Sequence, residues 1–395
     1  MQNTWFDNML SGKYISDLLC KLIINGNTLK ILQVITSLYP GGAEIMLANL
    51  CLGLKERGHE VKVISLLPLP EASFVMDRLN EANINAASLN ATKLTPWRFM
   101  GLAGKVEEFA PDIVHSHLFH ANITARINRC GRYGALLNTV HTMEMRPHRQ
   151  WYYTIDRITA GMCDMQNAVS CAARDFHAMK CGLNPIDIPV VYNGINLPTP
   201  LTDEEAVSIR SGWNVDDCDY VIGSVGRFCP EKGFDVLLEA LPVLGNMLPP
   251  GNKLGLVLLG DGEEHDKLLK LASVSPDNIK VSFPGLVPDA ARLSGAFDLF
   301  VMPSRFEGFG LVLAEAMSHG TPVLVNDIPP LIELLNLYDS GMAIDFHGDR
   351  KIVCREIIKA MEMPRTPPPE LPFTTENMIE GYLDLYNKLV MLREK

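Results

Sequence analysis

The 395-residue sequence has no apolar run near the roughly 20 residues that cross a bilayer, because its longest runs have strand length. Residues 1–7 lack the basic and then apolar layout of a secretory signal. The nine cysteines form no C-x-x-C pair, and an odd number fits neither a disulfide framework nor a zinc cluster. We therefore expect a globular protein of the cytoplasm, a reducing compartment. We assign it no cofactor and no bound metal.

Positive charge is also scarce, and the net charge is −11 at pH 7. Residues 1–200 carry 18 Lys and Arg against 16 Asp and Glu, whereas residues 201–395 carry 17 against 30. The acidic second half excludes nucleic-acid binding through a basic surface. Residues 126–157 differ, since they interleave six arginines with Tyr and Trp, a mixture suited to peripheral contact with an anionic membrane. A solvated helix face with a few aromatics at its rim is the alternative.

A chain of 395 residues exceeds the usual size of one hydrophobic core, so two domains are expected. From residue 30 onward, short β-branched runs alternate with longer helical stretches, the pattern of doubly wound parallel sheets. Strands are predicted at 31–35, 61–66, 84–89, 113–117, 138–141, 168–170, 189–192, 220–225, 256–259, 279–283, 299–302, 322–326 and 343–345. The predicted fold class is α/β, with two Rossmann-like domains facing each other across a cleft.

Breaks in this pattern set the predicted domain boundaries. Residues 1–29 form an N-terminal extension without an assigned role, and the first domain spans 30–200. A polar, weakly patterned link over 197–219 leads into a second domain over 215–372. A Pro-rich break then precedes a last helix, predicted over 374–395.

Two carboxylates, Glu307 and Glu315, stand eight residues apart across a glycine-split turn that opens a predicted helix. The turn offers unpaired amides at the positive end of the helix dipole, which predicts a phosphate site. These amides belong to Phe309, Gly310 and Leu311. Glu307 in the loop suits a sugar, and Glu315, about one turn inside the helix, suits the hydroxyls of a ribose. Two solvated glutamates are the alternative, which the apolar neighbours of Glu315 disfavour.

Fixed cations are predicted beside this turn. Arg227 follows a predicted strand and Lys232 stands five residues on, at the start of the next helix, so both can converge on one diphosphate. Gly41 and Gly42 follow the first strand, where the backbone can approach a phosphate or a sugar; a plain tight turn is the alternative. Neither this turn nor the glycine pair at 260–263 has the third glycine of G-x-G-x-x-G, which disfavours a dinucleotide oxidoreductase.

Three histidines lie on predicted strands of the first domain. His141 ends one strand and is expected to face the cleft, where a neutral imidazole can bind a sugar hydroxyl. His115 and His117 share one face of another strand and are predicted to shape the acceptor side. Without an acid or Cys at matching spacing, a metal pair at these two residues is disfavoured. A structural role is the alternative for His141.

Glu307 and Glu315 with the turn between them resemble the E-x7-E signature of retaining nucleotide-sugar glycosyltransferases, specifically glycosyltransferase family 4 with its GT-B fold. Other segments resemble that family's landmarks in its order, and the similarity covers roughly residues 30–392. These segments are 40–44, 112–117, 140–142, 193–195, 226–233 and 260–263.

The resemblance implies roles for several residues. Arg227 and Lys232 would hold the diphosphate without a divalent ion, and His141 would contact the donor sugar as a residue needed for transfer, together with Glu307. By analogy, Leu286 and Val287 would lie near the base. The last helix would cross back to the first domain. A front-face mechanism is also implied, in which the departing phosphate oxygen accepts the proton of the acceptor.

The expected function is transfer, with retention, of a hexose or N-acetylhexosamine from a nucleotide diphosphate sugar, a UDP-sugar being favoured. The acceptor would be a glycan or a polyprenyl-linked precursor of surface polysaccharide or lipopolysaccharide, at the inner face of the cell membrane. One alternative is a nucleotide-sugar 2-epimerase, which would consume donor without an acceptor. Another is a catalytically silent nucleotide-sugar binding protein, which would bind donor without releasing nucleotide. The sugar, the base and the linkage stay open.

Overall fold

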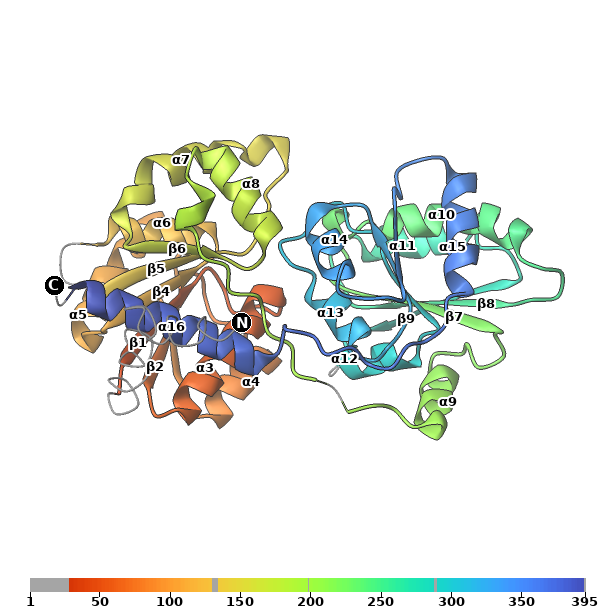
Figure 1. The fold of residues 1–395 in the computed structure, drawn as a ribbon, viewed down its shortest axis with the longest axis horizontal. Coiled ribbons are helices and arrows are strands. Elements are labelled where there is room, and N and C mark those ends of the chain that lie inside the picture. Colours follow the sequence, from red (N-terminus) through yellow and green to blue (C-terminus); the bar gives the residue numbers. More distant parts are fainter. Residues whose placement is uncertain (1–27, 130–133, 198, 288–289, 394–395) are drawn as a thin grey trace, which may run out of the picture.

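The computed structural model of the chain describes residues 28–129, 134–197, 199–287 and 290–393, and it shows two α/β domains side by side (Figure 1). Each domain is built on a six-stranded sheet in which every pairing is parallel. Parallel sheets need cover on both faces, and most of these strands are accordingly buried apolar runs. The predicted pair of Rossmann-like domains is confirmed.

In the first domain the strand order is β3 (Asn85–Ser88), β2 (Glu60–Ser65), β1 (Lys30–Ile35), β4 (Ile113–His117), β5 (Ala135–Val140) and β6 (Met165–Ala168). The α-helices of this part of the chain are α3 (Gly42–Glu56), α4 (Phe74–Glu81), α5 (Leu102–Phe109), α6 (Phe119–Ile127), α7 (Trp151–Thr159) and α8 (Cys171–Cys181). The order reverses between β1 and β4, and ligands of such sheets bind where the loops after these two strands diverge.

The second domain repeats this order. Its strands are β9 (Ile279–Gly285), β8 (Leu254–Leu259), β7 (Tyr220–Val225), β10 (Leu299–Met302), β11 (Val323–Asn326) and β12 (Gly341–Ile344). Its helices are α9 (Asp203–Gly212), α10 (Phe234–Met247), α11 (His265–Ala272), α12 (Ala290–Leu293), α13 (Leu311–Met317), α14 (Pro329–Leu335) and α15 (Arg350–Met361).

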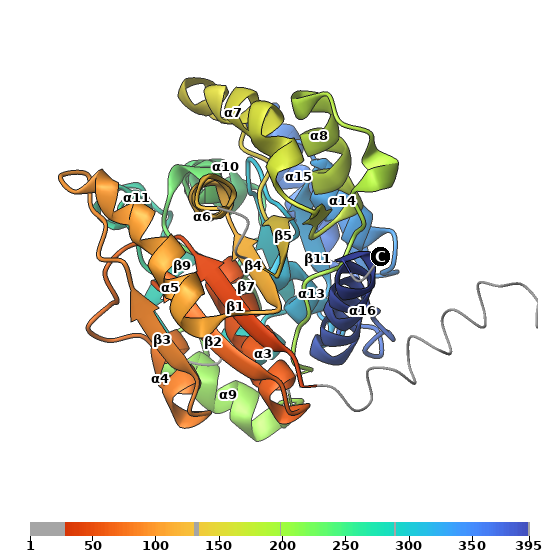
Figure 2. The same ribbon diagram turned by 90° about the vertical axis from the view of Figure 1, so that its left-hand side faces the viewer.

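The last helix, α16 (Thr375–Arg393), follows the second domain in sequence but lies along the first (Figure 1). It packs so closely on α3 that a Cβ on Gly53 would lie 2.0 Å from Ile379. Its tyrosines Tyr382 and Tyr386 are fully buried in the core of the first domain. Figure 2 shows α3, α4 and α16 on one face of the first sheet and α5 and α6 on the other. The expected crossover helix is therefore present.

Two local predictions of strands were wrong. Residues 189–192 form a single bridge, between Ala168 and Val190, in place of a full strand. The strand predicted at 168–170 ends at Ala168, because Ser170 accepts a hydrogen bond from the amide of Ala173 and caps α8. The structure also adds a helix that was not predicted, α9, within residues 197–219; it starts with a capping box that the sequence displays as T-x-x-E.

Some predictions lie outside the described residues. These are residues 1–27 of the extension, together with Arg132 and Tyr133 of the basic aromatic stretch. Among the helices that the structure does describe, none combines the length and the apolar character needed to span a bilayer.

Candidate active site

The loops after β7 and β10 of the second domain meet the loops after β1 and β5 of the first, at the carboxyl ends of both sheets. The two backbones touch at Gly308, where a Cβ would lie 1.8 Å from the carbonyl oxygen of His141. Ser170 secures the contact, because its Oγ donates a hydrogen bond of 2.6 Å to the carbonyl of Gly308. A glycine is thus needed at position 308 for the domains to meet.

Lys232 and Glu307 come together inside this junction. Lys232 Nζ lies 2.6 Å from Glu307 Oε1, and only 12% of the Glu307 side chain is exposed. Gly233 makes the approach possible, because its φ of +69° and missing side chain bring the loop after β7 onto the carbonyl of Pro303. Two residues that the sequence assigned to diphosphate and sugar are therefore adjacent in space.

The turn before α13 has the glycine conformation that the sequence predicts, since Gly310 has a φ of +104°. Phe309 is 2% exposed as a whole residue, and its ring packs edge-on against Phe373. Leu311 contacts the first domain, because a Cβ on Gly42 would lie 3.3 Å from Leu311 Cδ1. Glu315 is half-buried and lies in the second turn of α13.

Arg227 reaches across to the first domain. Its Nη2 donates a hydrogen bond of 2.9 Å to the carbonyl of Pro40, and it would lie 3.0 Å from a Cβ on Gly41. The same imagined Cβ would lie 2.5 Å from Glu44 Oε2. Gly41 therefore leaves room for an arginine and a buried acid to share the space above the first strand.

Glu44 is a candidate that the sequence reasoning missed. Burial raises the pKa of its carboxyl to about 7, against the lowering effects of its own backbone amide, Arg227 and Ser37. The sequence does contain a signal for Glu44, because this acid is the last residue of the P-G-G-A-E segment that follows the first strand. Its importance depends on Arg227, which lies in the other domain and so is not visible from local sequence.

The three histidines form a buried row behind this junction. His141 is 7% exposed, and burial lowers its pKa to about 3, so the ring is neutral. Its Nε2 lies 3.0 Å from Nδ1 of His117. His115 and His117 have no exposed surface, and burial holds both pKa values well below the usual range. Neither of these two rings lines the cavity described next, so any effect on an acceptor has to pass through a lining residue that they contact, which is Thr139 for His115 and His141 for His117.

A cavity of about 220 Å³ opens in the first domain beside His141. Its lining includes Thr36, which follows β1, together with residues of α7 and of the start of α6. The side chains around it include Phe119, His120, Glu144, Arg149, Tyr152 and Asp156. Apolar rings and charged groups together suit a sugar, which has apolar faces and polar edges.

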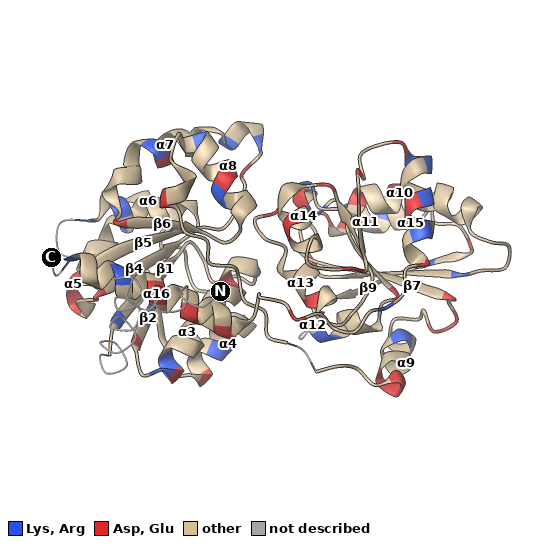
Figure 3. Cartoon of the chain, in the orientation of Figure 1, with Lys and Arg blue, Asp and Glu red and all other residues tan. Residues whose placement is uncertain are grey.

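Aromatic rings stand at this cavity. Phe119 and Tyr152 stack with centroids 3.9 Å apart and planes 4° from parallel. Trp151 packs edge-on against both rings and is 53% exposed. Arg149 lies over the Tyr152 ring at 5.8 Å. The predicted basic aromatic stretch thus borders the cavity, and Figure 3 shows its Lys and Arg positions around α7.

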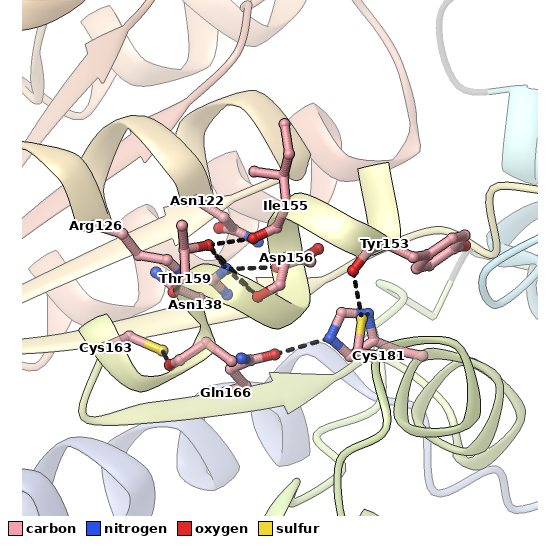
Figure 4. A network of polar contacts seen from close by, with 12 residues as sticks. Asn122, Arg126, Asn138, Tyr153, Ile155, Asp156, Thr159, Cys163, Gln166 and Cys181 are labelled. Carbon is pink, nitrogen blue, oxygen red and sulfur yellow. Dashed lines mark hydrogen bonds and ion pairs between the residues drawn. The ribbon is translucent and has the colours of Figure 1, made fainter. Parts of the chain in front are cut away.

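Beneath the cavity lies a polar network (Figure 4). Asp156, His177 and Cys181 bring their donor atoms within 4.8 Å of one another, an arrangement that can hold a metal ion. Here Arg126 already donates to Asp156 at 2.5 Å, and burial raises the pKa of the Cys181 thiol to about 12. A paired carboxylate and a protonated thiol are poor metal ligands, so we read the group as core hydrogen bonding.

Ion pairs link the domains beside the site. Arg146 of the first domain donates to Glu231 of the second at 2.7 Å and also pairs with Glu144. Burial alone would raise the pKa of Glu144, but hydrogen bonds and charge from Arg146 outweigh it and leave the pKa below the usual value. Glu333 of α14 accepts hydrogen bonds of 2.8 Å from two amides at the start of α8. Sequence reasoning missed these contacts, because each joins segments far apart in the chain.

The residues predicted near the base follow β9. Leu286 is 71% exposed, whereas Val287 packs against the core of the second domain. The side chain of Leu286 is therefore open to a ligand, whereas that of Val287 is partly covered by the core.

Both domains match known families. A model described as Glycosyltransferase Family 4 matches residues 40–198, and one described as Glycosyl transferases group 1 matches residues 208–371. The uncharacterised glycosyltransferase MJ1607 of Methanocaldococcus jannaschii is 27% identical over 339 residues, which cover 79% of this chain and 84% of that protein. LpsE of Rhizobium meliloti, a lipopolysaccharide core biosynthesis glycosyltransferase, is 43% identical over 137 residues, which cover 35% of this chain and 38% of LpsE.

Solved structures share the fold. A glycosyltransferase of Rickettsia africae has a TM-score of 0.74 at 19% identity, covering 92% of this chain and 99% of its own. HepE of Anabaena, in complex with UDP and glucose, has a TM-score of 0.70 at 20% identity, covering 93% and 97%. At these identities the likeness concerns the fold alone. Because glycosyltransferase models match both domains and solved glycosyltransferases share their arrangement, the chain belongs to the glycosyltransferases of the GT-B fold.

Proposed function

We propose that the protein is a retaining glycosyltransferase that moves a hexose or N-acetylhexosamine from a nucleotide diphosphate sugar, a UDP-sugar being favoured. The observation that carries this proposal is the meeting of Lys232 and Glu307 at 2.6 Å, at the carboxyl ends of the second sheet. Arg227 lies in the same loop as Lys232, and the turn at Gly310 follows Glu307.

The positive charges near the turn at Gly310 support binding of a diphosphate donor there. A diphosphate that leaves a sugar gains negative charge, which Arg227 and Lys232 can stabilise as fixed cations. Glu315, half-buried in α13, is assigned to the ribose hydroxyls, and Leu286 and Val287 to the surroundings of the base. HepE, which shares the fold, was solved with UDP-glucose, and this favours a UDP-sugar donor.

For the chemical step we propose a front-face mechanism without a protein nucleophile. The departing phosphate oxygen takes the proton of the attacking hydroxyl, so the bond to the acceptor forms on the face from which the phosphate leaves. Arg227 and Lys232 stabilise the leaving group, and Glu307 and His141 contact the transferred sugar. Two fixed cations supply the charge that a divalent ion would otherwise provide, so the reaction is proposed to be metal-independent.

The acceptor is assigned to the cavity beside His141. Stacked rings at Phe119 and Tyr152 suit the apolar face of a sugar, and Arg149 suits a phosphate or another anionic group. We propose a glycan or a polyprenyl-linked precursor of surface polysaccharide or lipopolysaccharide. LpsE, which is named for lipopolysaccharide core biosynthesis, supports this choice.

The site of action is proposed to be the cytoplasmic face of the membrane. Around α7, exposed apolar side chains accompany the arginines: Trp151 is 53% exposed and Ile158 is 76% exposed. Such a surface suits peripheral binding to anionic lipid. Cosedimentation with anionic and neutral vesicles tests it, and equal binding to both would remove the charge argument.

One assay separates this function from its rivals. The protein is screened by thermal shift against nucleotide sugars, and nucleotide release is then measured with and without glycan acceptors. Release that depends on acceptor, with an anomeric configuration equal to that of the donor by NMR, is the expected result. Donor consumption without acceptor would indicate a 2-epimerase, and binding without release would indicate a silent binding protein.

A further inference from the structure

A buried chain of hydrogen bonds connects the crossover helix to the candidate site. Tyr386 of α16 lies 3.1 Å from Gln33 of β1, and Gln33 lies 2.7 Å from His117 of β4. His117 in turn lies 3.0 Å from His141. The first three side chains have no exposed surface, so water cannot substitute for a missing partner. The last member, His141, lines the cavity.

A second branch fixes the direction of the hydroxyl of Tyr386. Thr139 donates to Asn167 at 2.7 Å, so its oxygen must accept from His115 Nε2, which lies 2.6 Å away. His115 is neutral, and its Nδ1 is then bare and accepts from Tyr386 at 2.7 Å. The single proton of the Tyr386 hydroxyl is therefore donated to His115 and cannot be donated to Gln33.

The direction of the remaining bonds follows. The oxygen of Tyr386 can only accept, so Gln33 presents its amide nitrogen to it and its carbonyl oxygen to His117. His117 must donate from Nε2 and, being neutral, has a bare Nδ1. That bare nitrogen accepts from Nε2 of His141. Only Nδ1 of His141 is then left, and it has no hydrogen-bond partner among the described residues.

We infer that this chain fixes His141 as the Nε2–H tautomer, so that its bare Nδ1 accepts a hydrogen bond from a hydroxyl of the transferred sugar. The inference rests on the proposed function for the identity of the ligand, but the tautomer stands on the contacts alone. Gln33, His117 and Tyr386 are positioning residues. A carboxylate or an ether oxygen at the same place would put two acceptors face to face, so the site selects a hydrogen-bond donor such as a hydroxyl.

The tautomer is read directly by NMR. The protein is labelled with ¹⁵N-histidine, and long-range ¹H–¹⁵N spectra separate a bare ring nitrogen from an N–H. His141→Gln identifies the signals by their loss. The expected spectrum shows Nε2 of His141 as N–H and Nδ1 as bare. A proton on Nδ1 would overturn the inference, because every bond in the chain would then run in the opposite direction.

Two variants probe the chain. Gln33→Met and Tyr386→Phe are expected to mix the His141 tautomers and to lower kcat/KM about tenfold, the effect of one misdirected hydrogen bond. Tyr338→Phe is the matched control, since Tyr338 is also buried and hydrogen-bonded but lies in the second domain. A wild-type tautomer and rate in Gln33→Met would overturn the positioning role. If a variant fails to fold, the spectrum of the wild-type protein still decides the tautomer.

Ligand titration tests the contact itself. UDP-glucose, or whichever nucleotide sugar binds in the thermal-shift panel, is expected to move the Nδ1 signal of His141, and the free nucleotide is not. An equal shift with nucleotide alone would overturn the sugar contact. If no nucleotide sugar binds, the proposed function fails, while the spectrum of the free protein decides the tautomer separately.

Discussion

The ammonium of Lys232 lies 2.6 Å from the carboxylate of Glu307, although the two residues are 75 positions apart in the chain. A diphosphate sugar bound at this point has to share Lys232 with Glu307. The cation would then contact the leaving group while the acid contacts the sugar, which places them on either side of the bond that breaks.

Replacing Lys232 tests the leaving-group role. Lys232→Ala is expected to lower kcat by about 100- to 1,000-fold, the usual loss when one group that stabilises transition-state charge is removed. Steady-state kinetics measure this, and circular dichroism checks the fold. Lys253→Ala is the control, because Lys253 forms an exposed pair with Asp217 at the amino ends of β7 and β8, whereas the junction lies at the carboxyl ends of these strands. Wild-type turnover in a folded Lys232→Ala protein would refute the site.

Glu315 should act on donor binding. Glu315→Ala is expected to abolish transfer, because a ribose that has lost its acceptor for two hydroxyls no longer holds the donor in place. Calorimetric titration with the donor measures the lost affinity. Unchanged affinity and turnover would show that Glu315 is a structural residue of α13.

Glu44 gives a pH dependence with a definite sign. Its folded pKa of about 7 lies above the ordinary value of 4.5, so the folded protein holds this proton where the unfolded chain has lost it. The free energy of unfolding therefore falls as pH rises from 4.5 to about 7 and then stays level, with a total effect on the order of 3 kcal/mol.

Denaturant unfolding at pH 5 and pH 8 checks this dependence. Glu44→Gln is expected to lose less stability than the wild-type protein between the two pH values, because an amide does not titrate. An equal loss of stability in both proteins would mean that the pKa of Glu44 is not raised, either because the carboxyl is solvated or because Arg227 offsets the effect of burial.

Gly308 tests the meeting of the domains. In Gly308→Ala the new Cβ would collide with the carbonyl of His141, so the domains cannot approach as they do here. We expect transfer to fall by about 100-fold, the cost of a small misplacement of reacting groups, while each domain stays folded. Kinetics and small-angle scattering measure the two effects. Gly104→Ala is the control, since nothing lies within 4 Å of its Cβ.

Metal independence is tested by a chelator. Activity is expected to persist after dialysis against EDTA, because Arg227 and Lys232 are proposed to supply the positive charge at the leaving group. Nucleotide release is measured before and after addition of Mg²⁺ or Mn²⁺. A strict requirement for either ion would contradict stabilisation by fixed cations alone.

Much of the fold could be read from local pattern. The strand predicted at 113–117 matches β4, and the strand at 299–302 matches β10, because buried parallel strands are short β-branched or apolar runs with clear ends. The failures have local causes too. The T-x-x-E pattern of the capping box before α9 is present in the sequence, but no helix was predicted from it. Ser170 was assigned to a strand because its capping role becomes evident only with the helix that follows it.

The residues of the candidate site likewise fall into those that the sequence indicated and those that only the structure revealed. The sequence indicated Arg227, Lys232 and Glu307 because glycines and charges at loop positions have a local signature. It did not indicate Glu44, Glu231 or Glu333, whose roles depend on partners in the other domain.

The sequence by itself determined the strands, most of the helices and the loops that carry the charged groups, because these depend on residues within a few turns of one another. The tertiary structure alone decided which loops meet. Pro40 and Arg227 are 187 positions apart, and Gln33 and Tyr386 are 353 apart, yet each pair shares a hydrogen bond. Burial, and with it the pKa of Glu44 and the neutral state of the three histidines, arises only when those distant segments pack and exclude water.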